Sequence, residues 1–260
     1  MNVRIATACL TGLALLCACA TAPRQEQQSV KPDEQSYNKA MEFFNSGNYF
    51  DSIPAFTALR EKFPLSPYAV LAELRLGESH YKKGEYIEAV HFFKNFRRLH
   101  PSNQYVPYSI FMTGMCYYKQ ILEPDRDQTF ARDAIEHFRL LIDQYPDTPY
   151  TGQALCKMSE ALKQLARHEF FVAQYYLGMG DYTAARKRLR NIFKQYPHSL
   201  PQAKLLYYYA KAALLSQEHD RGMKVLRLLG QKYPSSPYAP KAQKLLKNPG
   251  SVSMEKQSSE

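Results

Sequence analysis

The chain has 260 residues, of which 45% are hydrophobic, with 20 tyrosines, 14 phenylalanines and no tryptophan. This composition is that of a folded protein and excludes a chain that is disordered throughout. The formal net charge of +10 at pH 7 fits nucleic acid, acidic protein surfaces or anionic headgroups as partners.

The amino terminus has the features of a bacterial export signal. Arg4 precedes a short apolar stretch from Ile5 to Leu16, which is too short to span a bilayer. The next residues, Leu16-Cys17-Ala18-Cys19, resemble a lipobox with Cys19 as the lipidated residue. Export to the cell envelope argues against nucleic acid as a partner and leaves acidic protein surfaces and anionic headgroups.

Residues 1–18 are therefore predicted to be a lipoprotein signal peptide. An ordinary signal peptide cleaved at Ala18 or Ala20 is the alternative. Several acyl chains on Cys19 would anchor the protein firmly, since one chain alone binds a membrane only marginally. Residues 19–34 are polar and have no apolar period, which predicts a flexible tether that holds the fold near the membrane without lying on it.

Five prolines, each preceded by an aromatic residue or histidine, mark five copies of one pattern. They are Pro64, Pro101, Pro146, Pro197 and Pro234. Twelve positions before each proline the residue is always small, and eight positions before it the residue is always large and apolar. The small residues are Ser52, Ala89, Ala134, Ala185 and Gly222, and the large ones are Phe56, Phe93, Phe138, Leu189 and Leu226. This repetition predicts an all-α, right-handed superhelical solenoid of five helix-pair repeats of the tetratricopeptide type.

Each repeat supplies a first helix, a turn, a second helix and the proline stop. Gly47, Gly84 and Gly180 stand at the turns, where glycine accepts the left-handed backbone that closes a helix. Proline ends the second helix because it lacks an N–H and restricts the residue before it. Small residues are expected where the first helix touches the second. They are Ala40, Gly77, Gly114, Ala173 and Ala210.

Two repeats carry insertions, because the prolines are spaced by 37, 45, 51 and 37 residues. The third repeat gains a charged loop around residues 123–128. The fourth is predicted to contain one long helix from Thr151 to Leu177. An extra helix is expected around Pro240 to Leu246, followed by a disordered tail over residues 248–260.

The reactive side chains do not form a catalytic pattern. The seven histidines are scattered, without His-Glu-x-x-His spacing, and no phosphate-binding Gly-Lys-Ser/Thr sequence exists. We therefore expect no enzyme activity, no metal and no cofactor. Cys116 and Cys156 lie in apolar helical contexts and are predicted to be buried thiols, although an oxidising compartment also permits a disulfide.

Three segments make the chain recognisable. They are Asp125-Arg126-Asp127 followed by Ala134, the run from His168 to Tyr176 before Gly180-Asp181-Tyr182, and the corner Phe63-Pro64-x-x-Pro67-Tyr68. Together with the lipobox and both insertions, they resemble the outer-membrane protein assembly factor BamD (ComL) family of lipoproteins, from about Tyr37 to Leu246. The insertion in the third repeat is shorter than in longer versions of the family.

The resemblance implies a scaffold of the machinery that folds and inserts outer-membrane β-barrel proteins. Repeats 1–3 (35–150) would offer a groove to a terminal strand or targeting segment of the unfolded client. Repeats 4 and 5 (151–247) would dock on the periplasmic domains of the barrel-forming subunit, beside other assembly lipoproteins. The protein would be lipid-anchored on the periplasmic face of the outer membrane. The alternative is a periplasmic adaptor that coordinates cell-wall synthesis or division, although the tether is too short for the coiled coil such proteins often add.

A basic segment carries the docking hypothesis. Arg186, Arg190 and Lys194 form a stripe at i, i+4 spacing, which is otherwise a solvated helix face. The resemblance makes Arg188 the docking residue for an acidic patch, and a guanidinium suits this because it can grip a carboxylate with two hydrogen bonds.

The resemblance, through the family's corner motif, makes Tyr68 and Arg75 the candidates for the client groove, with Tyr37 and Tyr108 also expected at its exposed edge. Packing within the core is the alternative role of these tyrosines. Asp125-Arg126-Asp127 is expected to tie its own loop, since Asp127 precedes a helix and can cap it.

Overall fold

The computed structural model describes residues 30–252. The predicted signal peptide, the lipobox with Cys19 and most of the predicted tether lie outside this range. The described part contains helices and no strand. The helices are α1 (Pro32–Asn45), α2 (Tyr49–Lys62), α3 (Pro67–Lys83), α4 (Tyr86–Leu99), α5 (Val106–Tyr118), α6 (Thr129–Gln144), α7 (Thr151–Met179), α8 (Tyr182–Gln195), α9 (Gln202–Leu215), α10 (His219–Lys232), α11 (Ala239–Lys247) and the short 3₁₀-helix η1 (Pro249–Val252).

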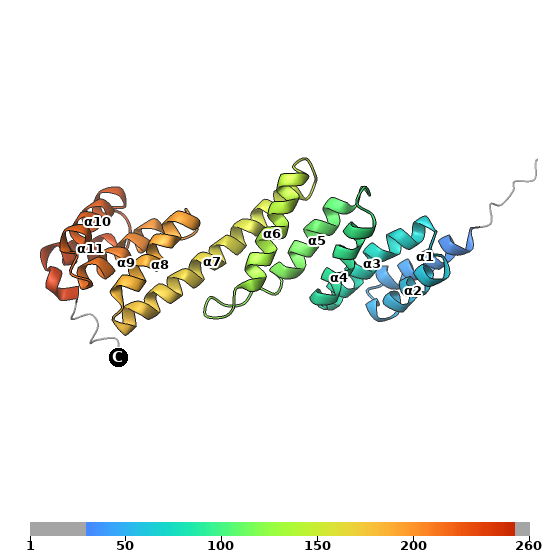
Figure 1. Ribbon diagram of the computed structural model, residues 1–260, viewed down its shortest axis with the longest axis horizontal. Coiled ribbons are helices and arrows are strands. Elements are labelled where there is room, and N and C mark those ends of the chain that lie inside the picture. The colour runs from blue at the N-terminus through green and yellow to red at the C-terminus, as the bar shows by residue number, and fades with distance from the viewer. Residues whose placement is uncertain (1–29, 253–260) are drawn as a thin grey trace, which may run out of the picture.

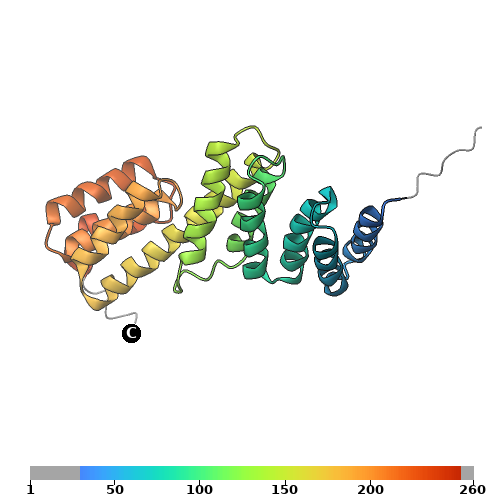
Figure 2. The ribbon, with the colours of Figure 1, turned by 45° about the vertical axis from the view of Figure 1, so that its right-hand side comes forward.

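Successive helices pack on one another along an elongated array (Figure 1). They form five pairs, from α1 with α2 to α9 with α10, and α11 closes the carboxyl-terminal end. The view in Figure 2 shows the same row of helices, with the first pair at one end and α9 to α11 at the other. The predicted all-α solenoid of five helix pairs is confirmed.

The turns and stops follow from the residues that the pattern places there. Gly47, Gly84 and Gly180 have φ values between 76° and 83°, a left-handed conformation that glycine adopts without a steric penalty. The residue before each of the five repeat prolines ends its helix with φ between −127° and −137°, outside the helical range.

The core between paired helices is built from the repeated small and large positions. Phe56, Phe93, Phe138, Leu189 and Leu226 are all at most 1% exposed. A Cβ atom on Gly114 would lie 2.6 Å from the ring of Phe138, and one on Gly77 would lie 2.8 Å from the ring of Phe93. The small residue of the first helix therefore lets the large residue of the second helix pack against the backbone of the first.

The two insertions take the forms that the sequence predicts. The long helix α7 runs from Thr151 to Met179, and in Figure 1 it crosses the array diagonally between the two ends of the molecule. Residues 119–128 form the loop between α5 and α6. The carboxylate Oδ1 of Asp127 accepts a hydrogen bond from the N–H of Thr129 at 2.8 Å, so Asp127 does tie the start of α6.

Both ends of the fold extend further than the sequence predicts. Helix α1 begins at Pro32, so residues 32–34, assigned to the tether, are helical. The tail was expected to be disordered from residue 248, but residues 249–252 form η1. Val252 is 4% exposed and belongs to the apolar cluster of the last repeat, which supplies the burial that orders this segment.

Val252→Ala is expected to lower the stability of the carboxyl-terminal repeat by about 1.5 kcal/mol, because two buried methyl groups are lost. Urea unfolding followed by circular dichroism measures the effect. Val30→Ala is the matched control, since Val30 is 56% exposed, and it should change stability by less than about 0.5 kcal/mol. Equal effects of the two substitutions would contradict the docking of η1.

The cysteine prediction holds for one residue and is wrong for the other. Cys116 is buried, and this burial raises the pKa of its thiol to about 12, so it stays protonated. Cys156 is exposed, because its position on α7 faces away from the neighbouring helices. Both thiols are free.

Candidate functional site

Three of the four residues predicted for the client groove, Tyr37, Arg75 and Tyr108, lie on one concave site in the first three repeats. The site has a volume of about 470 Å³. It is lined by Tyr37, Leu71, Leu74, Arg75, Glu78, Tyr105, Tyr108 and Tyr150. These residues come from the first helices α1, α3 and α5 and from the segments that lead into α5 and α7. The array therefore places aromatic and apolar side chains around a charged pair, and we call this site the amino-terminal groove.

An ion pair lies at the centre of the groove. Nη1 of Arg75 donates to Oε2 of Glu78 at 2.5 Å, one turn further along α3. The hydroxyl of Tyr108 donates to the other carboxylate oxygen of Glu78 at 2.6 Å. Nε of Arg75 donates to the hydroxyl of Tyr37 at 3.5 Å, and its guanidinium lies 5.5 Å from the ring centre of Phe44. One hydrogen-bond network thus joins side chains from three repeats, with Tyr37 linked to the carboxylate of Glu78 through Arg75.

The protonation states of the groove follow from this network. Burial alone lowers the pKa of Arg75, but Glu78 and the hydroxyl of Tyr37 outweigh it, and the pKa lies above its ordinary value. Burial, followed by the charge of Glu78, raises the pKa of Tyr108 above its usual range. Arg75 therefore remains charged and Tyr108 remains a neutral hydrogen-bond donor.

Tyr68 lies beside the groove and does not line it. Its ring centre is 5.3 Å from that of Tyr37, and its backbone N–H is held by Oγ of Ser66. Burial, followed by the charge of Glu34, raises the pKa of Tyr68. Tyr68 thus packs on Tyr37 at the edge of the groove, and its predicted place among the groove residues is wrong because its ring lies against Tyr37 outside the lining.

Sequence reasoning missed Glu78, Tyr105 and Tyr150 as groove residues. The signal for Tyr150 was available, because Tyr145-Pro146-Asp147-Thr148-Pro149-Tyr150 repeats the corner that contains Tyr68. In the structure the ring of Tyr150 stacks on Phe111 at 5.5 Å and lies 5.3 Å from Tyr108. Glu78 could have been found as the acidic residue one turn after Arg75.

The basic segment of α8 does not form one exposed stripe. Arg188 is partly exposed, and its Nη1 lies 3.2 Å from both carboxylate oxygens of Glu169 on α7. Arg186 is 9% exposed and pairs with Glu218, with Oγ of Ser216 at 3.4 Å. Only Arg190 and Lys194 of the predicted stripe are exposed. The stripe prediction is therefore wrong for Arg186, because Glu218 from the next repeat covers that face.

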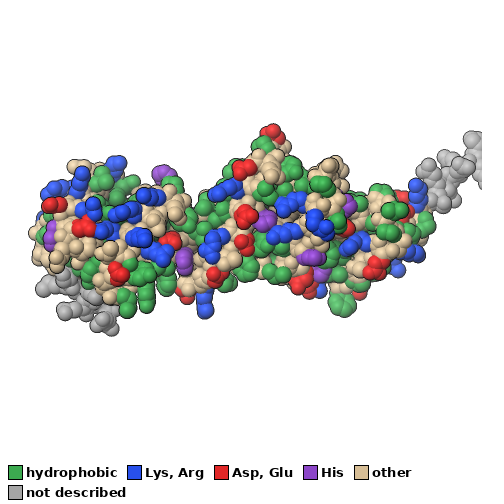
Figure 3. Space-filling view, in the orientation of Figure 1, with side chains coloured by type: hydrophobic (Ala, Val, Ile, Leu, Met, Phe, Trp, Pro, Cys, Tyr) green, Lys and Arg blue, Asp and Glu red, His purple; other side chains and the backbone are tan. Residues whose placement is uncertain are grey.

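Basic side chains nevertheless dominate this end of the molecule. In Figure 3, more Lys and Arg than Asp and Glu side chains cover the part formed by α8 to α10. Arg190 and Lys194 are exposed on α8. An acidic partner surface would be attracted to this end of the molecule.

Two kinds of site are not found in residues 30–252. This part of the chain holds no group of three or more His, Cys, Asp or Glu side chains placed to bind a metal ion. None of its helices is long and apolar enough to cross a membrane.

Comparison with known proteins gives a consistent result. A family model described as "YfiO: Outer membrane lipoprotein" matches residues 29–221. A protein of Neisseria gonorrhoeae named "Outer membrane protein assembly factor BamD" is 27% identical over 241 residues, which cover 87% of this chain and 90% of that protein. The protein of the same name from Caulobacter vibrioides is 25% identical over 220 residues, or 85% of this chain and 72% of that protein.

Among solved structures, the yeast Sti1 fragment described as "TPR2AB-domain:pHSP90-complex" aligns with 85% of this chain and 86% of its own. The alignment has 14% identity and a TM-score of 0.43.

Proposed function

The chain belongs to the YfiO family of outer membrane lipoproteins, and on that premise we propose that it is a non-catalytic scaffold for the assembly of outer-membrane β-barrel proteins. The relatives named as assembly factors match it over most of both chains, which supports this role. The helix-pair array fits it as well, since stacked repeats provide extended binding surfaces. Acylation of Cys19 would hold the array at the periplasmic face of the outer membrane.

The amino-terminal groove is the proposed site for an unfolded client. An extended peptide binds well where its side chains reach aromatic contacts and its polar groups reach hydrogen-bond partners. Tyr105 and Tyr150 supply such rings, while Arg75 and Glu78 supply a cation and a carboxylate side by side. This groove is the observation that carries the client-binding part of the proposal.

Photocrosslinking tests the client site directly. A photoreactive residue at Tyr105, which is 38% exposed on the groove wall, should form adducts with an unfolded β-barrel protein. The same residue at Phe50 is the matched control, because Phe50 is 79% exposed and does not line the groove. Equal labelling from both positions, or none from Tyr105 and Tyr68, would remove the groove from the proposal.

The carboxyl-terminal repeats are the proposed docking site for the barrel-forming subunit and for other assembly lipoproteins. Arg190 is exposed and Arg188 is partly exposed, so both can meet a partner, whereas Arg186 is buried in an ion pair with Glu218. Pull-down from detergent-solubilised outer membranes should recover a large β-barrel protein. Recovery of murein synthases without a barrel would instead support an adaptor for cell-wall synthesis.

A charge swap separates the internal role of Arg188 from its docking role. Arg188→Glu is expected to weaken recovery of the barrel subunit about tenfold or more, because a carboxylate would face the acidic partner. It also places two carboxylates together, since Glu169 is the internal partner of Arg188. Adding Glu169→Arg restores the internal ion pair with reversed polarity. The double variant should regain stability in urea unfolding but should not recover the barrel subunit in the pull-down. If the double variant does recover the barrel subunit, Arg188 serves only the internal ion pair with Glu169.

A further inference from the structure

The two insertions of the array meet and hold one another. Nε2 of Gln164, in the lengthened part of α7, donates to the backbone carbonyl of Leu122 at 2.8 Å. One turn further, Nδ1 of His168 lies 2.7 Å from the backbone carbonyl of Pro124 and donates to it. The inserted loop of the third repeat is thus fastened to the inserted stretch of the fourth. Neither contact could exist in a repeat of the basic length.

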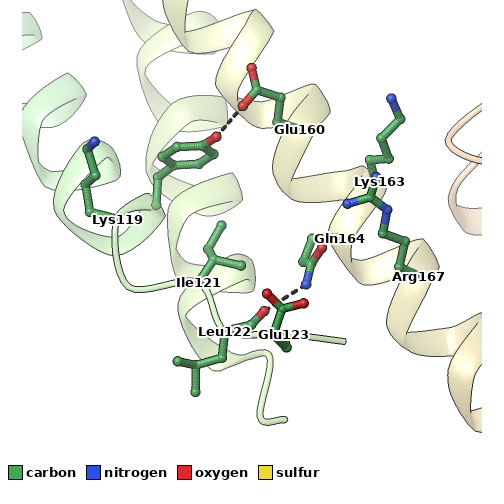
Figure 4. Close-up of a pocket in the computed structure, with 9 residues that line it drawn as sticks. Lys119, Ile121, Leu122, Glu123, Glu160, Lys163, Gln164 and Arg167 are labelled. Carbon is green, nitrogen blue, oxygen red and sulfur yellow. Dashed lines mark hydrogen bonds between the residues drawn. The ribbon is translucent and has the colours of Figure 1, made fainter. Parts of the chain in front are cut away.

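A pocket of about 530 Å³ opens between these two segments. It is lined by Tyr118, Lys119, Ile121, Leu122 and Glu123 on one side and by Glu160, Lys163, Gln164 and Arg167 on the other. Figure 4 shows the side of α7 that faces the inserted loop, with the hydrogen bond from Gln164 to Leu122 joining the two segments. We call it the insertion pocket. It lies at the opposite end of α5 from Tyr108 and the amino-terminal groove.

Positive side chains outnumber negative ones in the lining of the insertion pocket. The side chains of Lys119, Lys163 and Arg167 form no ion pair or hydrogen bond with the rest of residues 30–252, and all three residues are exposed. Glu160 is already engaged, because Nζ of Lys157 lies 3.1 Å from it and the hydroxyl of Tyr118 also binds it. Glu123 is the one lining carboxylate that the cations could meet. Three cations around one carboxylate leave a surplus of positive charge at the pocket.

Apolar side chains lie next to this charge. Leu122 is 47% exposed on the loop, and Ile121 also lines the pocket. A ligand with both carboxylates and apolar groups would satisfy the two kinds of surface. The carboxylate of Glu123 can accept a hydrogen bond from a peptide N–H, a donor that a peptide carries beside its carboxylates and apolar side chains and that a phosphate anion lacks. The chemistry therefore favours a peptide over a lipid headgroup.

We propose that the insertion pocket binds a short acidic and apolar peptide segment of a protein partner, separately from the client groove. Carboxylates of the segment pair with Lys163, Arg167 and Lys119, and an adjoining apolar side chain covers Leu122. The volume is within the range of about 300–1,000 Å³ that ligand pockets have. The insertions thereby give the array a third binding surface, in addition to the groove and the basic surface of α8.

Fluorescence anisotropy with a labelled pentapeptide of alternating aspartate and leucine tests the proposal on the mature chain in detergent micelles. The peptide should bind saturably, and a counterpart with asparagine in place of aspartate should bind at least about tenfold more weakly, because charge-assisted hydrogen bonds are lost. Binding should weaken with added salt. The double variant Lys163→Met and Arg167→Met keeps the helix-forming stems and should also weaken binding at least about tenfold.

The matched control is the double variant Lys224→Met and Arg227→Met, which removes two exposed cations from α10 and leaves the pocket intact. It should bind the acidic peptide within about twofold of the unaltered chain, since distant exposed charges are largely screened. Equal loss in both double variants would mean attraction to net charge alone and would overturn the pocket assignment. Equal binding of the two peptides would overturn it too. If inorganic phosphate or phosphatidylglycerol vesicles bind the pocket and the peptide does not, a phosphate ligand replaces the peptide.

Discussion

Phe138→Ala is expected to destabilise the third repeat by about 3–5 kcal/mol, the largest stability effect we expect from one side chain. Phe138 is fully buried in α6, and its ring occupies the space above Gly114 on α5. The ring centre of Phe111 lies 6.1 Å away. Alanine would leave a cavity between the two helices, because the glycine opposite has no side chain that could fill it.

Urea unfolding followed by circular dichroism and by hydrogen exchange measures this effect. Exchange should accelerate first in α5 and α6, because stability in a repeat array is a sum of repeat and interface terms. Phe171→Ala is the matched control, since Phe171 is 45% exposed on α7 and should change stability by less than about 1 kcal/mol. A loss below about 1 kcal/mol for Phe138→Ala would contradict the packing of the ring over Gly114.

Much of the fold could be predicted because a solenoid is governed by contacts that are close in sequence. The offset of eight positions before each proline marks residues such as Phe93 and Leu226, which are at most 1% exposed. Each of these residues packs on a partner in its own repeat, so one repeat carries the information needed to place it. Five copies of the same spacing then confirm one another, as Gly77 opposite Phe93 and Gly114 opposite Phe138 show.

The errors arise where contacts outside the local pattern decide the environment. Arg186 has the i, i+4 spacing of a solvated stripe, yet Glu218 from the following repeat pairs with it and buries it. Cys156 has apolar neighbours in sequence, but the long helix α7 turns it towards solvent. Val252 follows a polar run and is buried only because α9 and α11 leave an apolar surface for it. Local pattern carries no information about such contacts.

The amino-terminal groove contains residues that the sequence predicts and one central residue that it does not. Tyr37, Arg75 and Tyr108 could be selected because they lie on successive first helices. In the structure Arg75 and Tyr108 donate to one carboxylate, and Arg75 also donates to Tyr37. That carboxylate, Glu78, was missed because an acidic residue one turn from an arginine is commonly an exposed helix pair. Glu78 is 9% exposed, and the hydroxyl that binds its carboxylate comes from Tyr108 in the third repeat.

Arg75→Met is expected to have the largest functional effect, a loss of client binding by about tenfold or more, because the groove would lose its cation. The probe is a β-barrel protein diluted from urea, and its crosslinking to Tyr105 measures the binding. The substitution also leaves the carboxylate of Glu78 without its ion-pair partner, which is expected to lower stability by about 1–3 kcal/mol. The two consequences must be separated, since a loosened repeat would also bind poorly.

The double variant Arg75→Met and Glu78→Gln separates them. Removing both charges of a partly buried pair costs less than removing one, and the amide can still accept from the hydroxyl of Tyr108. This variant should regain most of the stability and still fail to bind the client. Arg60→Met is the matched control, because Arg60 forms a more exposed ion pair with Glu73 at 3.7 Å outside the groove. Client binding restored by the double variant would show that Arg75 serves the fold alone.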